Sequence, residues 1–539
     1  MSAALQWARR AVIGLTALWA LTLAVCFALR IGFPLELEWM EGGSLHQALR
    51  LQQGLPIYPT PSAEFVPFLY TPLYPALLAA LGWVFPLGYA LGRAVSVLAV
   101  VAVGVGLWRL VGREGKPRAH QAAAVGMWCA GWVFSFRWYD VARADSLFLA
   151  LLLWGLLLLR DARGRPRRAA LAGLLVALAF WTKQTAAVFV LASGLAALWI
   201  APRQLLWYAG VIALVDGGGV LLGQRLTDGQ LWRYIYELHQ THAFNGERFA
   251  RKTWGMFLHA APLLAALLAG LLGAGLRRVL LWWRARGAVS QDMSKSTGPE
   301  GQALRDRREG VAYWGLMAAT GLLVSALGYS TQWAEPNAFM PGVCFGAALL
   351  AVALPVGRGE AEALGLVAAQ LVFALALEPR YQPIQDHGVA AGLKDSYVRQ
   401  HWNRSVPTPG LRRQAQALRA ELEAQDGPVL ALQRPWWSVL AGGPGHVGVM
   451  GIHDLPRAEQ RAIEQTLAAA VEVGVPSAVY LDGDAPKWLR PALGRRYRVA
   501  RKWEGSTRVL PLTGYMSVAG MTTPWRGAQW LYLRRDEAP

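Results

Sequence analysis

The sequence predicts a polytopic α-helical membrane protein with about eleven spans, one further helix at the outer membrane interface and a small C-terminal α/β domain. Of its 539 residues, 54% are hydrophobic and 16% are charged, whereas ordinary soluble domains carry roughly a quarter charged residues. The hydrophobic residues come in runs of about 15 to 22, the length that a helix needs to cross a bilayer. Short Arg-rich segments separate these runs.

Each apolar run gives one predicted span. The first run, residues 11–29, follows Arg9 and Arg10 and has no small-residue cleavage site, which favours an uncleaved span over a signal peptide. The other spans are predicted at residues 90–110, 120–136, 145–159, 169–182, 186–200, 205–223, 257–276, 311–330, 342–356 and 363–377. Residues 73–85 are apolar but are bracketed by prolines and too short for a span, so we expect a helix at the outer interface.

The distribution of Lys and Arg predicts the orientation in the membrane. Segments assigned to the cytoplasm hold about twice as many cations as the loops on the other side. We therefore expect a multi-pass protein of the inner (cytoplasmic) membrane, with its N-terminus in the cytoplasm and its C-terminal domain outside. The formal charge of +19 is explained largely by this bias, so membrane lipids are expected partners and nucleic acid is not.

Two domains are expected, a transmembrane domain over residues 1–377 and an extracytoplasmic α/β domain over residues 378–539. Beyond residue 378 no apolar run is long enough to span. Residues 429–432 and 477–481 have the pattern of strands, and residues 457–473 that of a helix. The three cysteines all lie within apolar runs, which excludes a disulfide framework.

Ionisable residues near the predicted outer ends of the spans are the candidate site residues, because exposure to lipid would cost several kcal/mol. Glu38 and Glu41 lie three apart in the first outer loop, where they form either paired carboxylates of an acid–base site or a solvated acidic edge. Arg143 and Asp145 precede a span, and a structural ion-pair network is the alternative there. Lys183 joins two short spans and either binds an anion or snorkels to the interface.

These clusters together resemble the GT-C superfamily of membrane glycosyltransferases. The similarity is greatest to bacterial family 39 enzymes related to the dolichyl-phosphate-mannose protein mannosyltransferases and to the lipid A aminoarabinose transferases. The matching stretches are residues 38–58, 68–75, 143–147, 181–185 and 335–341. The resemblance extends to about residue 377 and implies a GT-C-like transmembrane domain.

The resemblance also implies which carboxylates act in catalysis. In the family, an Asp-Glu pair in the first outer loop supplies the base that acts on the acceptor. Its Glu matches Glu41, but its Asp position holds Met40, so the base is expected to be Glu41 or Glu38. A second family Asp matches Asp145, which is expected to orient the acceptor, the base or a divalent cation.

Binding roles follow from the same resemblance. Lys183 matches the family's Thr-Lys motif, and with Arg143 it is expected to hold the phosphate of the donor. Tyr70 stands where the family has a Lys-Pro-Pro turn, and with Asn337 it is expected to contact the sugar or the acceptor. No cofactor is assigned with certainty, and no metal ligands are assigned, although a divalent cation, Mg²⁺ or Mn²⁺, stays an open alternative.

The predicted function is that of a glycosyltransferase, a hexosyl- or pentosyltransferase. It would move a sugar, with inversion, from a polyprenyl-phosphate-linked donor to a lipid, glycan or protein acceptor of the cell envelope. A transporter or lipid flippase is one alternative, although it would place ionisable residues near the middle of the bilayer. An inactive GT-C-like scaffold is the other, motivated by Met40 and Tyr70.

Overall fold

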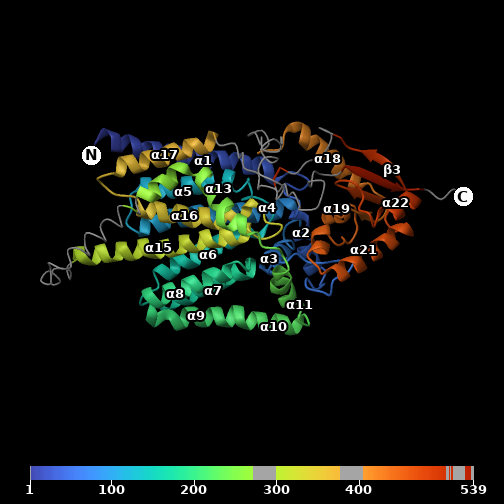
Figure 1. Ribbon diagram of the computed structural model, residues 1–539, viewed down its shortest axis with the longest axis horizontal. Helices are drawn as coiled ribbons and strands as arrows, with labels where there is room; N and C mark the ends of the chain where they lie inside the picture. The colour runs from blue at the N-terminus through green and yellow to red at the C-terminus, as the bar shows by residue number, and fades with distance from the viewer. Residues whose placement is uncertain are drawn as a thin grey trace.

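The protein consists of a bundle of apolar helices and a C-terminal tail (Figure 1). A computed structural model describes residues 2–270, 273, 299–376, 405–504, 509, 512–513 and 529–535. Here "the bundle" means the helices up to residue 376, and "the tail" means the described residues from 405 onwards. The predicted boundary between residues 377 and 378, and the end of the predicted span 257–276, lie outside the described residues.

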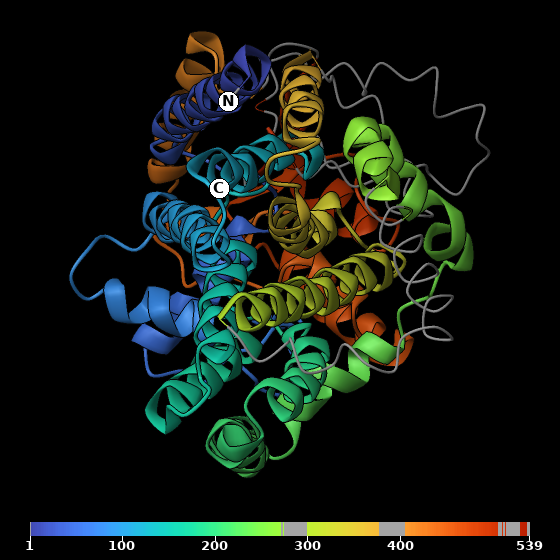
Figure 2. The same cartoon turned by 90° about the vertical axis from the view of Figure 1, so that its left-hand side faces the viewer.

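The helices of the bundle lie where the sequence predicts spans, because each apolar run folds as a helix. Seen from the end opposite the tail, several of them are viewed along their axes (Figure 2). They are α1 (Ala3–Ile31), α4 (Tyr89–Arg113), α5 (Arg118–Phe134), α6 (Ala144–Arg160), α7 (Pro166–Thr182), α8 (Ala186–Ile200), α9 (Leu205–Ile212), η2 (Ala213–Gly217), α10 (Gly218–Leu226), α13 (Thr253–Ala260), α15 (Pro299–Tyr329), α16 (Met340–Ala353) and α17 (Glu360–Ala376).

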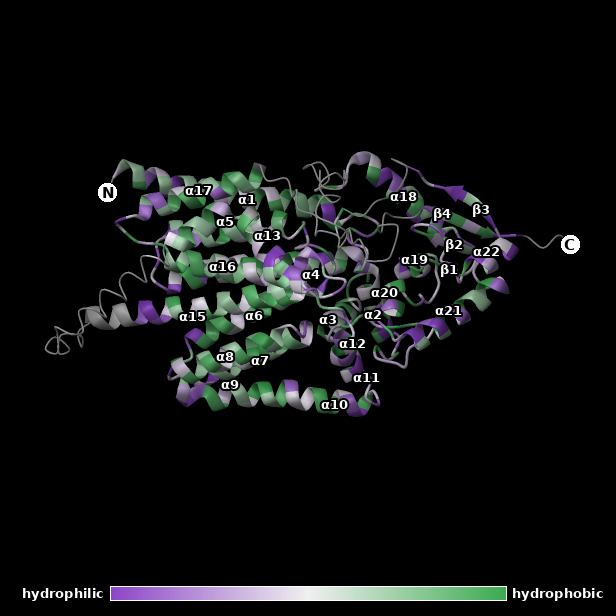
Figure 3. Cartoon of the chain, viewed as in Figure 1, coloured by the Kyte–Doolittle hydropathy of each residue, from purple (hydrophilic) through white to green (hydrophobic). Residues whose placement is uncertain are grey.

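The bundle has the length and polarity of a membrane domain. Hydrophobic residues dominate it, whereas the tail is mixed (Figure 3). Within the described chain, five helices are long and apolar enough to span: Ala3–Ile31, Tyr89–Arg113, Pro202–Leu226, Asp306–Tyr329 and Pro336–Ala353. A sixth is counted if Arg248–Leu258 and Pro262–Gly270, which are bent by 98°, form one broken span.

The number of spans depends on helices of intermediate length. The helices α5, α6, α7 and α17 have 17 residues each, and α8 has 15. These lengths are slightly below the ~20 residues of a typical span. Several described helices are thus long and apolar enough to span a membrane, and the count of eleven stays a prediction.

Short helices cover the end of the bundle that faces the tail. They are α2 (Glu41–Gln52), α3 (Leu73–Leu81), α11 (Gln230–Trp232), η3 (Arg233–Glu237), α12 (Leu238–Gln240), η4 (Arg248–Lys252) and η6 (Pro336–Phe339). A further short helix, η1 (Pro202–Gln204), joins α8 to α9. The helix α3 corresponds to the predicted interfacial helix. Beyond its end, Trp83 and Val84 are each 76% exposed, as expected of side chains that enter a membrane interface. The position of α3 relative to the bilayer stays a prediction.

The hairpin of α6 and α7 determines where two candidate site residues lie. The two helices have equal length and pack against each other as antiparallel neighbours, so the first turn of α6 lies beside the last turn of α7. Asp145 is in the first turn of α6, and Lys183 is the C-terminal cap of α7. A carboxylate at a helix N-terminus and a cation at a C-terminus both interact favourably with the helix dipoles.

The tail combines helices with a small mixed sheet. The sheet has the order β1-β2-β4-β3, with β1 and β2 parallel and the other neighbours antiparallel. The elements of the tail are α18 (Pro409–Glu423), β1 (Val429–Leu430), α19 (Pro435–Leu440), α20 (Val449–His453), α21 (Arg457–Glu472), β2 (Ala478–Leu481), α22 (Arg490–Arg496), β3 (Tyr497–Lys502) and β4 (Trp530–Arg534). Both predicted strands and the predicted helix are present in it, with slightly shorter bounds.

A buried polar cluster joins the tail to the bundle. The Glu36 carboxylate accepts hydrogen bonds from the Tyr89 hydroxyl at 2.6 Å and the Trp437 indole at 2.9 Å, and it lies 3.5 Å from the Arg434 guanidinium. Arg434 also pairs with Asp482 at 3.0 Å. All five side chains are buried. Since a charge buried without its partner is costly, the cluster makes the position of the tail specific.

We expect Arg434→Met to destabilise the protein by about 3 kcal/mol, because it leaves two carboxylates without their buried cation. Thermal unfolding of the purified protein and the rate at which protease releases the tail measure this effect. Arg419→Met is the matched control, since Arg419 pairs with Glu423 at 2.7 Å on an exposed helix face. Such a pair contributes at most about 1 kcal/mol. Equal behaviour of the two variants would contradict a docking role for Arg434.

Candidate functional site

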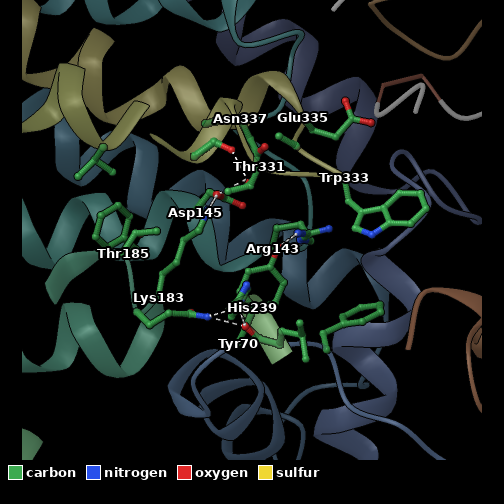
Figure 4. Close-up of a pocket in the computed structure, with 18 of the residues that line it drawn as sticks. Tyr70, Arg143, Asp145, Lys183, Thr185, His239, Thr331, Trp333, Glu335 and Asn337 are labelled. Carbon is green, nitrogen blue, oxygen red and sulfur yellow. Dashed lines mark hydrogen bonds and ion pairs between the residues drawn. The ribbon is translucent and has the colours of Figure 1, made fainter. Parts of the chain in front are cut away.

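A cavity of about 380 Å³ lies where the bundle meets the tail. Residues from α6, α15, α16, η3, α12 and η6, together with adjacent loops, line most of it, and Met450 and Asp454 of the tail line the rest. Tyr70, Arg143, Asp145, Lys183 and Asn337 are the predicted site residues that line it, and all of them appear around the pocket in Figure 4.

Asp145 is the centre of a hydrogen-bonded group inside the cavity. Its Oδ1 accepts from Lys183 Nζ at 2.5 Å and from Asn337 Nδ2 at 3.0 Å, and its Oδ2 accepts from the Trp138 indole at 3.3 Å. The ends of three helices, α6, α7 and η6, therefore meet at one carboxylate. Lys183 is held in place but retains donors for an anion, since an ammonium group has three.

Arg143 forms a second cationic group beside the first. One of its terminal nitrogens donates to the Tyr70 hydroxyl at 2.8 Å, and the other contacts Glu38 Oε2 at 3.2 Å. Burial alone would lower the pKa of the Arg143 guanidinium, but Tyr70, Glu38 and Asp145 raise it above its ordinary value. Arg143 is therefore a permanent positive charge in the cavity wall.

Glu38 lies behind Arg143 and is not among the described residues that line the cavity. Its Oε1 is buried and has no hydrogen-bond partner in the described part of the chain. Burial raises the pKa of the Glu38 carboxyl to about 7, although Arg143 opposes this shift. Glu38 thus combines an available oxygen with a proton affinity suited to proton transfer near neutral pH.

Glu41 has a different environment from the one expected of a catalytic base. Both oxygens bind the Arg93 guanidinium, at 2.9 and 2.7 Å, and they also accept from the backbone N–H groups of Leu37 and Ala142, at 2.6 and 2.8 Å. Glu41 is completely buried and is not among the described cavity residues. Glu41, one of the two expected bases, therefore has no oxygen free for an acceptor, because Arg93 and the backbone occupy both. Met40, the preceding residue, does line the cavity.

Glu335, His242 and Asp454 are among the polar cavity residues that were not selected as site residues from the sequence. His242 Nε2 lies 3.1 Å from Asp454 Oδ1, which links the bundle to the tail at the cavity wall. Glu335 directly precedes Pro336 and Asn337 in a stretch that matches the GT-C resemblance, and this adjacency was the available signal. Asp454 lies in a tail segment without a motif, so the sequence held no comparable signal for it.

A loop next to Glu335 is fixed in an unusual conformation. Trp333 has a φ of 66°, which is uncommon for a residue with a side chain. Its ring stacks on that of His453 in the tail, with ring centroids 5.9 Å apart and an interplanar angle of 16°. Strained backbone that the surroundings hold in place is typical of functional sites.

Among the described ranges, no three His, Cys, Asp or Glu side chains come together as a group that could hold a metal ion. His239, which has the helical spacing of a ligand pair with His242, instead contacts the Leu69 carbonyl and Gln184, both at 2.6 Å.

Comparison with known proteins identifies the architecture. Residues 68–296 match glycosyltransferase family 87. ArnT from Cupriavidus metallidurans bound to undecaprenyl phosphate superposes with a TM-score of 0.53 and 11% identity, over 96% of this chain and 98% of that chain. The chain has the fold of ArnT. The apo state of the same ArnT gives a TM-score of 0.55 at 12% identity, over 96% and 97% of the two chains. No curated protein sequence matches the chain.

The GT-C fold and the family 87 match confirm the resemblance predicted from the sequence. They also support a glycosyltransferase embedded in a membrane by apolar helices. At 11–12% identity the likeness to ArnT shows the fold alone. The roles of single residues in this GT-C chain therefore depend on the geometry of its own cavity.

We expect Glu41→Gln to destabilise the protein by about 3–5 kcal/mol. The substitution removes the negative charge that neutralises the buried Arg93 guanidinium. Thermal unfolding followed by Trp fluorescence measures this effect. Glu362→Gln, at an exposed position of α17, is the control and should unfold like the wild type. A Glu41→Gln protein with wild-type stability and no activity would instead point to a direct role of Glu41 in the chemistry.

Proposed function

We propose that the protein transfers a sugar from a polyprenyl-phosphate-linked donor to an envelope acceptor at the outer face of the cytoplasmic membrane. The observation that carries this proposal is the pair of cations, Lys183 and Arg143, in a cavity at one end of an apolar helix bundle. A lipid-linked donor has its anionic phosphate at the membrane surface, where this end of the bundle would lie. The binding of undecaprenyl phosphate by ArnT, which has the same fold, supports this class of donor.

In this proposal the two cations stabilise the leaving phosphate. Arg143 offers a planar guanidinium and Lys183 a compact ammonium, so together they can neutralise charge that develops on the phosphate as the bond to the sugar breaks. Asp145 keeps Lys183 in position before the donor binds. Since the cations are already placed, little reorganisation is needed when the charge develops.

Polar groups beside the cations would orient the sugar and the acceptor. The Tyr70 hydroxyl and the Asn337 amide face the same cavity as Asp145. Inversion requires the acceptor oxygen to attack the anomeric carbon on the face opposite the phosphate, while a carboxylate takes its proton. Of the two first-loop glutamates, only Glu38 has an oxygen without a partner in the described chain, whereas Arg93 and backbone N–H groups bind both oxygens of Glu41.

The proposed sidedness places the cavity and the tail outside the cytoplasm. Cations are concentrated in the segments that would then face the cytoplasm, as the positive-inside rule requires. The N-terminus would be cytoplasmic, and the tail would lie over the cavity, to which it contributes Met450 and Asp454.

An inactive GT-C-like scaffold is the second candidate, because Met40 lines the cavity at the position where the family has a carboxylate. A scaffold of this kind would bind the lipid phosphate but would release no product. Turnover of the donor separates the two candidates: only an enzyme produces free polyprenyl phosphate in membranes that contain donor and acceptor.

We expect Lys183→Ala to lower the release of polyprenyl phosphate by about 10²-fold, the usual effect of removing one group that stabilises transition-state charge. Mass spectrometry of lipids from membranes that contain the variant measures this release. Lys183→Arg should restore part of the rate because it keeps the charge.

Lys502→Ala is the matched control, since Lys502 lies on strand β3 of the tail and pairs with the exposed Glu504. This variant should behave like the wild type. Equal rates for Lys183→Ala and the wild type would refute the assignment of the phosphate site.

A further inference from the structure

No first-loop carboxylate is among the described cavity residues, but the segment before η6 supplies one. Met40 occupies the first-loop position, and Glu38 lies behind Arg143. Glu335 lines the cavity from the loop between α15 and η6. Two residues later in the same loop, Asn337 binds Asp145 at 3.0 Å. Glu335 therefore belongs to the same short segment that completes the Asp145 group.

Glu335 is the cavity carboxyl with an unused oxygen. It is 7% exposed, and its buried Oε1 has no hydrogen-bond partner among the residues that the structure describes. By contrast, both oxygens of Asp145 accept hydrogen bonds, and Asp454 is engaged with His242. An unsatisfied buried oxygen costs free energy, and such a group calls for an explanation beyond packing.

We propose that Glu335 is the catalytic base that accepts the proton of the acceptor hydroxyl. Glu38 is a positioning residue, whose negative charge influences the protonation of Glu335. This assignment rests on the proposed glycosyl transfer. The acceptor would lie between Glu335 and the cations, on the side of the cavity that the tail closes with Met450 and Asp454.

In the proposed step, Glu335 takes up the proton that the acceptor hydroxyl loses as it attacks the sugar. The acceptor oxygen forms a bond to the anomeric carbon, and the bond between that carbon and the phosphate oxygen breaks. The electron pair of the broken bond leaves with the polyprenyl phosphate, next to Lys183 and Arg143. The hydroxyl proton moves to a carboxylate oxygen of Glu335, which later returns it to water.

The charges around Glu335 support this role. Burial and the Glu38 carboxylate raise the pKa of Glu335 to about 8, whereas Arg143 and Arg248 oppose the shift. Glu335 is therefore mostly protonated at pH 7, and its basic form increases as the pH rises through 8. The rate should increase by about 25-fold between pH 6.5 and 8.5 if this ionisation alone controls it.

Three variants test the assignment in membranes that contain the native donor and acceptor. Glu335→Gln keeps the size of the side chain but cannot accept the proton, so we expect the release of polyprenyl phosphate to fall by 10²-fold or more. Glu335→Asp should retain part of the rate. Glu38→Gln removes a neighbouring negative charge and should move the rise in rate to lower pH. Glu472→Gln, in an exposed pair with Arg495 in the tail, is the control.

Two measurements on the purified protein distinguish loss of the catalytic base from loss of the folded site. Glu335→Gln should bind undecaprenyl phosphate as tightly as the wild type, and it should lack the infrared band of a protonated carboxyl that titrates near pH 8 in the wild type. A wild-type rate and pH profile in Glu335→Gln, with Lys183→Ala still impaired, would overturn the role of Glu335 alone. Absence of turnover in the wild type, or unimpaired turnover in Lys183→Ala, would overturn the proposed function instead.

Discussion

The buried ion pair of Glu41 and Arg93 is the interaction on which the rest of the site depends. Arg93 projects from α4 and donates to the backbone carbonyls of Phe33 and Leu35 at 2.7 and 2.6 Å, in addition to its two contacts with Glu41. Glu41 in turn fixes the N–H of Ala142, directly before Arg143. One ion pair therefore joins the first loop, α4 and the start of α6. Its cost in desolvation is offset because nearly every polar atom is satisfied.

This arrangement separates the residues that hold the site from those that act in it. The Glu41–Arg93 pair lies outside the cavity, while Arg143 and Asp145 at the start of α6 face into it. The α6–α7 hairpin then brings Lys183 to Asp145, and the dipoles of both helices favour the signs of these charges. The cations of the cavity are consequently placed by rigid helix ends, which position functional groups more accurately than loops do.

The sequence was sufficient for features that depend on local pattern. Apolar runs located the helices, and Asp145 and Lys183 could be selected because each lies at the end of a run where lipid exposure would be costly. Features that depend on tertiary partners could not be predicted. Nothing in the first loop distinguishes Glu38 from Glu41, since only the position of Arg93 on another helix makes one structural. Glu335 was not selected because only the fold shows that one of its oxygens has no partner among the described residues.

The docking of the tail has a consequence for biosynthesis. Glu36 emerges early from the ribosome, but its partner Arg434 follows 398 residues later and Trp437 follows 401 later. Until the tail is made, the first loop must therefore carry a carboxylate that has Tyr89 as a partner but lacks Arg434 and Trp437. The cavity wall that Met450 and Asp454 provide is equally missing until this stage. A nascent or truncated chain would thus be unable to build the complete cavity, which ties the start of activity to completion of synthesis.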